Sequence, residues 1–249
     1  MVVRAAHELG DGEVVFVGIG LPNLACNLAR ATHAPNLVLI YESGAVGAVP
    51  DRLPVSIGDP ALVTGSLAVA TMADVFQFYL QGGRIQVGFL GGAQVDRYGN
   101  INSTVIGPYE KPKVRLPGSG GACEIAIHAK RVIVVAPLTP RTFPASVDFI
   151  TSPGHNGKYG TRSSMHLPGA GPVRVVTDVG VLEPASRDGE LELVAIYPGV
   201  DPEETRKKAG WPLRVAPNLT VLPPPTQKEL HLLRDVLDPN HLYIEKRDA

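Results

Sequence analysis

Short runs of valine, leucine and isoleucine recur along the chain with turns and amphipathic stretches between them, and this alternation constrains the fold more than any other feature. Such runs are typical of parallel strands that are buried on both faces. The runs expected to form strands are 14–17, 37–40, 85–90, 132–135, 173–176 and 191–195.

Helix signals lie among these runs and after them. Pro22 suits the first turn of a helix, Asp201 suits an N-cap, and Thr226 with Glu229 matches a capping box. The segments expected to be helical are 21–31, 74–81, 201–208 and 226–234. Because strands and helices alternate, the sequence predicts an α/β fold with an open, mostly parallel sheet and helices on both faces.

The composition excludes several classes of protein. With 249 residues, of which 44% are hydrophobic and 19% charged, the chain can bury a core and is not a disordered protein. Its net charge of −1 provides no basic stripe for phosphates, so no nucleic-acid partner is expected. The most apolar segments, 61–70 and 132–137, are shorter than the roughly 20 residues that cross a bilayer, so no membrane span is expected.

The N-terminus lacks the pattern of a secretory signal, so a cytoplasmic location is expected. The first helical stretch, 5–9, is short, which leaves open whether the start lies upstream. Cys26 and Cys123 are too few for a disulfide framework and are expected to be small buried residues. Because the histidines are scattered without ligand spacing, no metal site is expected.

Two glycine loops follow the first two expected strands. In the first, Gly18 and Gly20 begin a dinucleotide fingerprint, but Asn23 replaces its third glycine, so the loop suits an anionic ligand better than a dinucleotide. In the second, Glu42 follows a buried strand and precedes Gly44. A carboxylate there is either capped or paired, or it acts as a nucleophile or base with glycine allowing a substrate to approach.

Two further glycine loops supply donors. Gln94 and Asn102 lie in or near the loop after the strand that ends at Leu90, where the stretch 96–100 also has the residues of a turn. The loop Gly118-Ser119-Gly120-Gly121 precedes an expected helix, so it either aims amides at an oxyanion or forms a flexible turn.

Taken in order, these motifs resemble the β subunit of the family I CoA-transferases, and among them the glutaconate CoA-transferase B subunit. The resemblance covers nearly the whole chain as one domain, 1–249. The matching motifs are Glu42-Ser43-Gly44, Gly91-Gly92-Ala93-Gln94-Val95-Asp96, Tyr98-Gly99-Asn100, Asn102-Ser103-Thr104, Gly118-Ser119-Gly120-Gly121-Ala122, Thr151-Ser152-Pro153-Gly154, Thr177-Asp178-Val179-Gly180-Val181-Leu182, Tyr197-Pro198-Gly199 and Asp238-Pro239.

The resemblance implies a ping-pong transfer in which Glu42 attacks an acyl-CoA and becomes a glutamyl-CoA thioester. It implies that amides of the loop from Gly118 to Gly121, above all Gly120 and Gly121, bind the oxyanion, and that Gln94 and Asn102 support the site or contact CoA. Amide donors beside Glu42 are expected to favour its ionised form. Coenzyme A enters as part of the substrate, and no permanently bound cofactor is expected.

The resemblance also implies a homologous α subunit, without which this chain is expected to be inactive, together with an acyl-CoA and a carboxylic acid acceptor as substrates. Glu42 is retained, whereas relatives that open a steroid-derived ring as hydrolases have lost it, which favours transfer over hydrolysis. An acyl-CoA or ring-opening hydrolase, and a non-catalytic module that binds acyl-CoA or senses a sugar phosphate, remain the alternatives.

Two basic residues, Lys158 and Arg162, follow the motif at 151–154 in a polar stretch. Either could attract a substrate carboxylate, but the stretch is expected to be a solvated loop.

Overall fold

The computed structural model describes residues 1–244, which form two compact units. The first unit contains Met1–Phe89 and the segment from Pro225 onward, and the second contains Leu90–Pro224. The sequence analysis expected a single domain, whereas the chain contains two compact units, each with its own set of paired strands. The chain returns to the first unit within the triple proline that precedes the last helix.

The strands of the first unit have the order β4-β3-β2-β1-β5. Its central strand β1 pairs in parallel with β2 and with β5, whereas β3 and β4 are added in antiparallel fashion. The bounds are β1 Val14–Phe16, β2 Val38–Ile40, β3 Ala45–Val46, β4 Ala68–Val69 and β5 Val87–Leu90.

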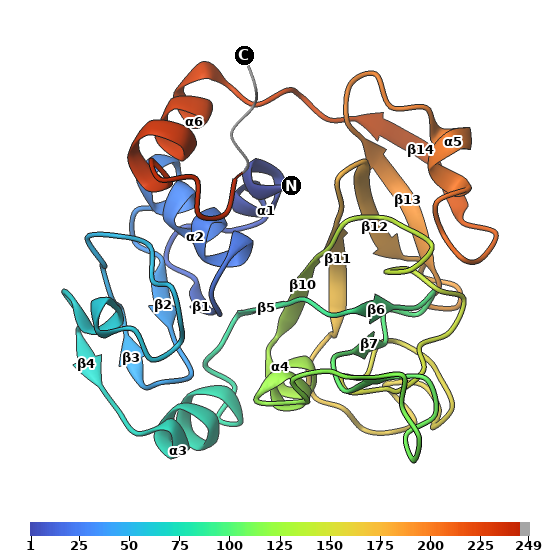
Figure 1. Ribbon diagram of the computed structural model, residues 1–249, viewed down its shortest axis with the longest axis horizontal. Coiled ribbons are helices and arrows are strands. Elements are labelled where there is room, and N and C mark those ends of the chain that lie inside the picture. Colours follow the sequence, from blue (N-terminus) through green and yellow to red (C-terminus); the bar gives the residue numbers. More distant parts are fainter. Residues whose placement is uncertain (245–249) are drawn as a thin grey trace. The chain divides into compact units, whose positions relative to one another are not determined.

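Two helices of the first unit begin at signals that the sequence analysis identified. α2 (Leu21–Thr32) has its proline in the first turn and buries Leu24, Cys26 and Leu28. α6 (Gln227–His231) begins with the capping box predicted at Thr226 and Glu229, and Figure 1 shows it in red beside α1 and α2 in blue. The other helical elements are α1 Val2–His7, η1 Pro60–Val63, α3 Met72–Asp74, η2 Val75–Leu80 and η3 Leu232–Leu237.

The strands of the second unit have the order β14-β13-β12-β11-β10, with β10 parallel to β11 and β13 parallel to β14. β12 pairs in antiparallel fashion with both of its neighbours. The bounds are β10 Arg131–Val135, β11 Pro172–Val176, β12 Gly180–Pro184, β13 Leu191–Ile196 and β14 Arg214–Val221. Two short ribbons and two short helices complete the unit: β6 Gln94–Val95, β7 Ile101–Asn102, β8 Val105–Ile106, β9 Val114–Arg115, α4 Ala122–His128 and α5 Pro202–Arg206.

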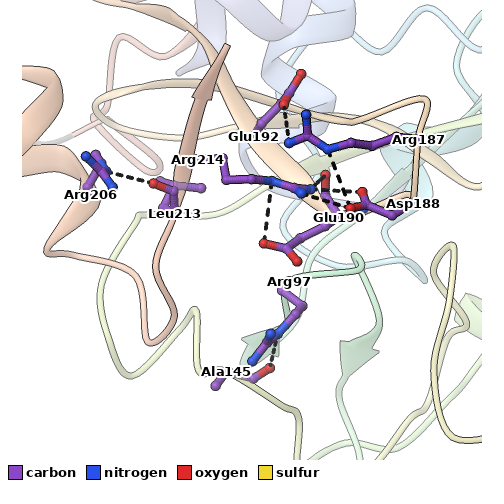
Figure 2. A network of polar contacts seen from close by, with 9 residues as sticks. All are labelled: Arg97, Ala145, Arg187, Asp188, Glu190, Glu192, Arg206, Leu213 and Arg214. Carbon is purple, nitrogen blue, oxygen red and sulfur yellow. Dashed lines mark hydrogen bonds and ion pairs between the residues drawn. The ribbon is translucent and has the colours of Figure 1, made fainter.

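A network of charged side chains joins β13, β14 and the turn before β13 (Figure 2). The guanidinium of Arg214 donates to both carboxylate oxygens of Asp188, at 2.8 and 2.9 Å. Arg187 also lies beside Asp188 and within 3.7 Å of Glu192. Because bidentate arginine–carboxylate pairs fix geometry, the network holds the turn against β14.

The predicted fold class is confirmed. All six predicted strands are present, and each of them pairs in parallel with at least one neighbour. Every antiparallel pair described above involves β3, β4 or β12, which the sequence analysis did not predict. The four predicted helices are also present, although those expected at 74–81 and 226–234 are each divided into two helical elements. No helix within residues 1–244 is both long and apolar enough to cross a bilayer.

One ion pair fixes the loop between β3 and β4. The Asp59 carboxylate, 2% exposed, accepts two hydrogen bonds from Arg52, at 2.7 and 2.8 Å. It also accepts from the backbone N–H of Val55 at 3.0 Å and of Ala61 at 2.9 Å. The Arg52 guanidinium and these two amides hold the pKa of Asp59 well below its ordinary value.

Substitution of Asp59 by Asn is expected to lower the melting temperature most at neutral pH. Because the folded-state pKa of Asp59 is depressed, its stabilising effect is complete above the unfolded value of about 4 and is lost as the pH falls toward the folded value. The difference in melting temperature between the native protein and Asp59→Asn should therefore narrow between pH 7 and pH 2.5. Asp51→Asn, on an exposed aspartate of the same loop, is the control. A difference that is independent of pH would contradict this account.

Candidate functional site

Glu42 lies at the tip of a tight turn that follows the buried strand β2. The backbone N–H of Tyr41 donates to Ala45 O at 3.0 Å, and the N–H of Gly44 donates to Tyr41 O at 2.9 Å. Glu42 is half-buried and Ser43 is exposed, whereas Tyr41 and Gly44 on either side are buried. These two hydrogen bonds fix the backbone of the turn and therefore the position of the Glu42 Cα.

The Glu42 carboxylate is not held by donors. Across residues 1–244, no hydrogen bond or ion pair engages this carboxylate. The expectation of amide donors beside Glu42 is therefore wrong for the isolated chain, as is the alternative of a capped or paired glutamate. The reason is geometric in part, because the amides of Tyr41 and Gly44 bond to backbone carbonyls.

Gly44 is required by a close backbone approach. Its φ is 109°, and a Cβ at this position would lie 2.0 Å from the carbonyl oxygen of Ala70. Ala70 N in turn donates to Gly44 O at 2.9 Å. The chain just after β4 thus contacts the turn that carries Glu42, and it is this backbone that leaves no room for a side chain at Gly44.

A buried hydrogen bond between Asn23 and Tyr41 connects the turn to α2. The Nδ2 of Asn23, in the first turn of α2, donates to the Tyr41 hydroxyl at 2.6 Å, and Asn27 donates to the Asn23 side chain at 3.0 Å. Burial raises the pKa of Tyr41 well above its ordinary value, so the hydroxyl stays neutral. Asn23, which displaces the third glycine of the dinucleotide fingerprint, therefore fixes the residue that precedes Glu42.

The glycine loop of the second unit is anchored at its start. Gly118 N donates to Ser103 O at 2.8 Å, and the Ser103 hydroxyl donates to Gly118 O at 2.8 Å. Gly118 and Gly120 have φ values of 101° and 47°, and Gly121 caps α4. Within the described chain the amides of Gly120 and Gly121 have no acceptor, and Gly120 is exposed whereas Gly121 is buried.

Gln94 and Asn102 face each other across the ribbon β6–β7 and are both buried. Asn102 Nδ2 donates to Gln94 Oε1 at 2.7 Å and to Val105 O at 2.6 Å. Gln94 Nε2 donates to Asp148 at 3.1 Å. These bonds occupy most of the polar atoms of the Gln94 and Asn102 side chains, which favours a role in supporting the site. A direct contact of either residue with CoA remains a prediction.

The second unit thus brings several predicted residues together, since Asn102 bonds to Gln94 and precedes the Ser103 that anchors Gly118. Glu42 belongs to the first unit, where Asn23 and Tyr41 are the supporting residues that the sequence analysis missed. A hydrophobic run gives no signal that its tyrosine meets an asparagine 18 residues earlier. No group of three or more His, Cys, Asp or Glu side chains in the described residues is arranged to hold a metal ion.

The expectation for Arg162 is wrong, whereas Lys158 is exposed as predicted. Arg162 is 7% exposed and donates to the carbonyls of Gly169 at 3.0 Å, Pro153 at 3.1 Å and Ala126 at 3.0 Å. Burial lowers the pKa of Arg162. Its guanidinium therefore fastens the loop to the end of α4 and does not bind a substrate carboxylate.

Gly44→Ala should destabilise the protein by more than about 3 kcal/mol, because it combines backbone strain with a clash against a carbonyl. Gly83→Ala is the matched control, since Gly83 has φ 71° but a Cβ added there would have no other atom within 4 Å. The strain alone should cost about 1–2 kcal/mol there. Chemical denaturation measures both, and equal losses would show that the approach of Ala70 is not the cause.

Comparison with known proteins identifies relatives over nearly the whole chain. The sequence model of the family described as "Coenzyme A transferase" matches residues 1–207. The B subunit of the 3-oxoadipate CoA-transferase of Pseudomonas knackmussii is 50% identical over 234 residues, covering 94% of this chain and 90% of the relative. The B subunit of the glutaconate CoA-transferase of Acidaminococcus fermentans is 35% identical over 248 residues, covering 98% and 92%.

Solved structures agree in fold. The crystal structure of glutaconate coenzyme A-transferase from Acidaminococcus fermentans superposes with a TM-score of 0.90 at 34% identity, covering 98% of this chain and 95% of that chain. The structure of the decarboxylase AibA/AibB gives a TM-score of 0.83 at 27% identity, covering 97% and 94%.

Proposed function

Because the chain belongs to the coenzyme A transferase family, we propose that it is the B-type subunit of a two-subunit enzyme that transfers CoA between an acyl-CoA and a free carboxylic acid. The observation that carries the proposal is the Glu42 carboxylate, which is presented on a rigid turn without an intramolecular partner in the described chain. A nucleophile needs this combination of a fixed position and free oxygens.

The proposed reaction has two symmetrical halves. A Glu42 oxygen attacks the thioester carbonyl, the C–S bond breaks, and CoA leaves as the thiolate while an acyl-glutamyl anhydride remains on the enzyme. The thiolate then attacks the glutamyl carbonyl, the C–O bond to the acyl carboxylate breaks, and a glutamyl-CoA thioester remains. The acceptor carboxylate reverses these steps and leaves with CoA. Neither water nor a net proton enters, and the covalent intermediate divides one difficult exchange into easier ones.

The glycine loop of the second unit is the proposed oxyanion site. The free amides of Gly120 and Gly121 match the donors that stabilise a tetrahedral intermediate, whose negative charge is borne by the former carbonyl oxygen. The proposal requires these amides to reach the carbonyl that Glu42 attacks. Gln94 and Asn102 would hold the loop through Ser103 and Gly118.

The names of the relatives support an α subunit as the partner and a dicarboxylic acid as a substrate. Two of them are named as B subunits, and AibA/AibB is named by two components, which supports an α subunit for this chain. The acids in the names of the two transferases, 3-oxoadipate and glutaconate, are both dicarboxylic acids. We therefore expect a dicarboxylic acid of similar length as the acyl group or acceptor, with 3-oxoadipate to be tested before glutaconate because the relative named for it is more similar.

Trapping of the intermediate tests the role of Glu42. The complex with the α subunit is incubated with an acyl-CoA but no acceptor, treated with borohydride, and analysed by peptide mass spectrometry. Modification is expected on the Glu42 peptide, and Glu42→Gln should lose turnover by on the order of a thousandfold or more without unfolding. Glu204→Gln, on the exposed face of α5, is the control. Full turnover in Glu42→Gln would refute the nucleophile, and release of free CoA at the turnover rate without acceptor would indicate a hydrolase.

A panel of acceptors tests the substrate class. Dicarboxylates should exceed the monocarboxylates of equal length by at least about tenfold in kcat/KM, because a buried polar site rejects a substrate that leaves its groups unpaired. Equal rates for both classes would contradict the proposed specificity while leaving CoA transfer intact.

A further inference from the structure

The motif from Thr151 to Gly154 in the second unit has no part in the proposed reaction, yet hydrogen bonds hold it along its length. Ser152 forms an antiparallel bridge with Ile101, in which Ile101 N donates to Ser152 O at 2.9 Å. Gly154 N donates to the Asn100 side chain at 2.8 Å. The motif therefore has a fixed position against β7 and the turn before it.

The hydroxyl of Thr151 contacts the two residues that join β7 to β8. It accepts from the backbone N–H of Ser103 at 2.9 Å and shares a hydrogen bond of 2.6 Å with the Thr104 hydroxyl. Thr151 is buried, whereas Ser103 and Thr104 are half-buried. Because the flanking strands have only two residues each, strand pairing alone gives these two residues little support. The Thr151 hydroxyl therefore ties them to a segment 48 positions away.

Residues 103 and 104 in turn hold the start of the glycine loop. Thr104 O accepts from Leu116 N at 2.9 Å. Ser103 exchanges two hydrogen bonds with Gly118, each of 2.8 Å. A series of hydrogen bonds therefore runs from the Thr151 hydroxyl to the first glycine of the loop.

The other end of the glycine loop is connected to the same motif. Gly121 is the N-cap of α4. The Arg162 guanidinium donates to Ala126 O in α4 at 3.0 Å and to Pro153 O at 3.1 Å. The motif therefore supports both ends of the segment whose two amides have no acceptor in the described chain.

We propose that Thr151 is a positioning residue for the amides of Gly120 and Gly121, acting through Ser103 and Gly118. The inference rests on the proposed function, in which these amides stabilise the negative charge on the attacked carbonyl oxygen. Glycine has the widest backbone freedom of any residue, so two consecutive glycines keep a defined direction only if the residues around them are held. A displacement of about 1 Å at such a donor is enough to reduce turnover strongly.

Thr151→Val tests the proposal in the complex with the α subunit, because valine has nearly the shape of threonine but no hydroxyl. The kcat for CoA transfer should fall by about tenfold to a hundredfold, whereas the KM for acyl-CoA should stay within about twofold, since the amides act on the transition state. Thr151→Ser keeps the hydroxyl and should restore kcat to within about threefold of the native value. Thermal melting shows whether each variant is folded at the assay temperature.

A second substitution interrupts the same series of hydrogen bonds at another point. Ser103→Ala removes the hydroxyl that donates to Gly118 O and leaves Thr151 unchanged. It should lower kcat by about fivefold or more, again with little change in KM. If Thr151→Val does not fold, this variant carries the test, and a native kcat in it would overturn the proposal.

The neighbouring Ser152 provides the matched control. Ser152 is 1% exposed, and its hydroxyl has no hydrogen-bond partner in the described chain. Ser152→Ala therefore removes a buried hydroxyl from the same motif without breaking a bond, and kcat and KM should stay within about twofold of the native values. A loss equal to that of Thr151→Val would show that any change in the motif disturbs the site, which contradicts a specific role of Thr151.

Amide hydrogen exchange provides a readout that does not depend on catalysis. In the full chain, exchange over residues 116–121 should be faster in Thr151→Val than in the native protein, because the support at Ser103 is lost. Exchange over the same residues should remain native in Thr151→Ser and in Ser152→Ala. Native exchange in Thr151→Val would show that Thr151 does not hold the loop, and the positioning role would be wrong.

Failure of this inference can be told apart from failure of the proposed function. If Glu42 forms the covalent adduct and Thr151→Val turns over at the native rate, transfer stands and the positioning role falls. If Glu42→Gln keeps full turnover while Thr151→Val loses it and Thr151→Ser restores it, the nucleophile falls and the positioning role stands. An increase in KM with a native kcat in Thr151→Val would assign the motif to substrate binding and would also overturn the positioning role.

Discussion

The hydrogen bond between Asn23 and Tyr41 is the contact on which the geometry of the first unit depends. It joins the first turn of α2 to the last residue before Glu42, and neither partner is exposed to solvent. A buried hydroxyl and amide are costly to leave unpaired, so each holds the other in place. Ala70, just after β4, contacts the turn at Gly44. The backbone at Glu42 is therefore fixed by α2 and by the chain that follows β4. Among the described residues, the Glu42 carboxylate is left without a bonding partner while the backbone beneath it is held in place.

Much of the fold could be predicted because its central strands are continuous apolar runs, and such runs are specific for strands buried on both faces. β14 was missed for a physical reason: it is largely exposed and contains Pro217 and Asn218, so it has neither the run nor the alternation that would identify it. The short strands β6 to β9 gave no signal either. Two residues cannot show a period, and these ribbons are positioned by side chains such as Asn102 rather than by local propensity.

The candidate site was predictable in part, for a different reason. Glycines and a carboxylate at strand ends stand out in sequence because they are poor choices for a core. Supporting residues do not stand out: Arg162 looks like any surface arginine until the carbonyls of Gly169, Pro153 and Ala126 surround it. Among residues 1–244 its charge is balanced by backbone dipoles and not by an acid, so no pattern of opposite charges could reveal it. Contacts of this kind depend on residues far apart in the chain, which sequence spacing does not encode.

The division of the chain has a consequence for biosynthesis. The first unit is built from both ends of the sequence, and the whole second unit, Leu90–Pro224, is inserted between them. α6 packs into the first unit through Glu229, whose carboxylate bonds to His7 at 2.5 Å across 222 positions of sequence. During synthesis, the inserted unit is therefore complete before the unit that began first. The segment bearing Glu42 is synthesised early, but its unit is complete only after α6 has been synthesised. The unit that carries the reactive carboxylate is therefore the last to reach its final form.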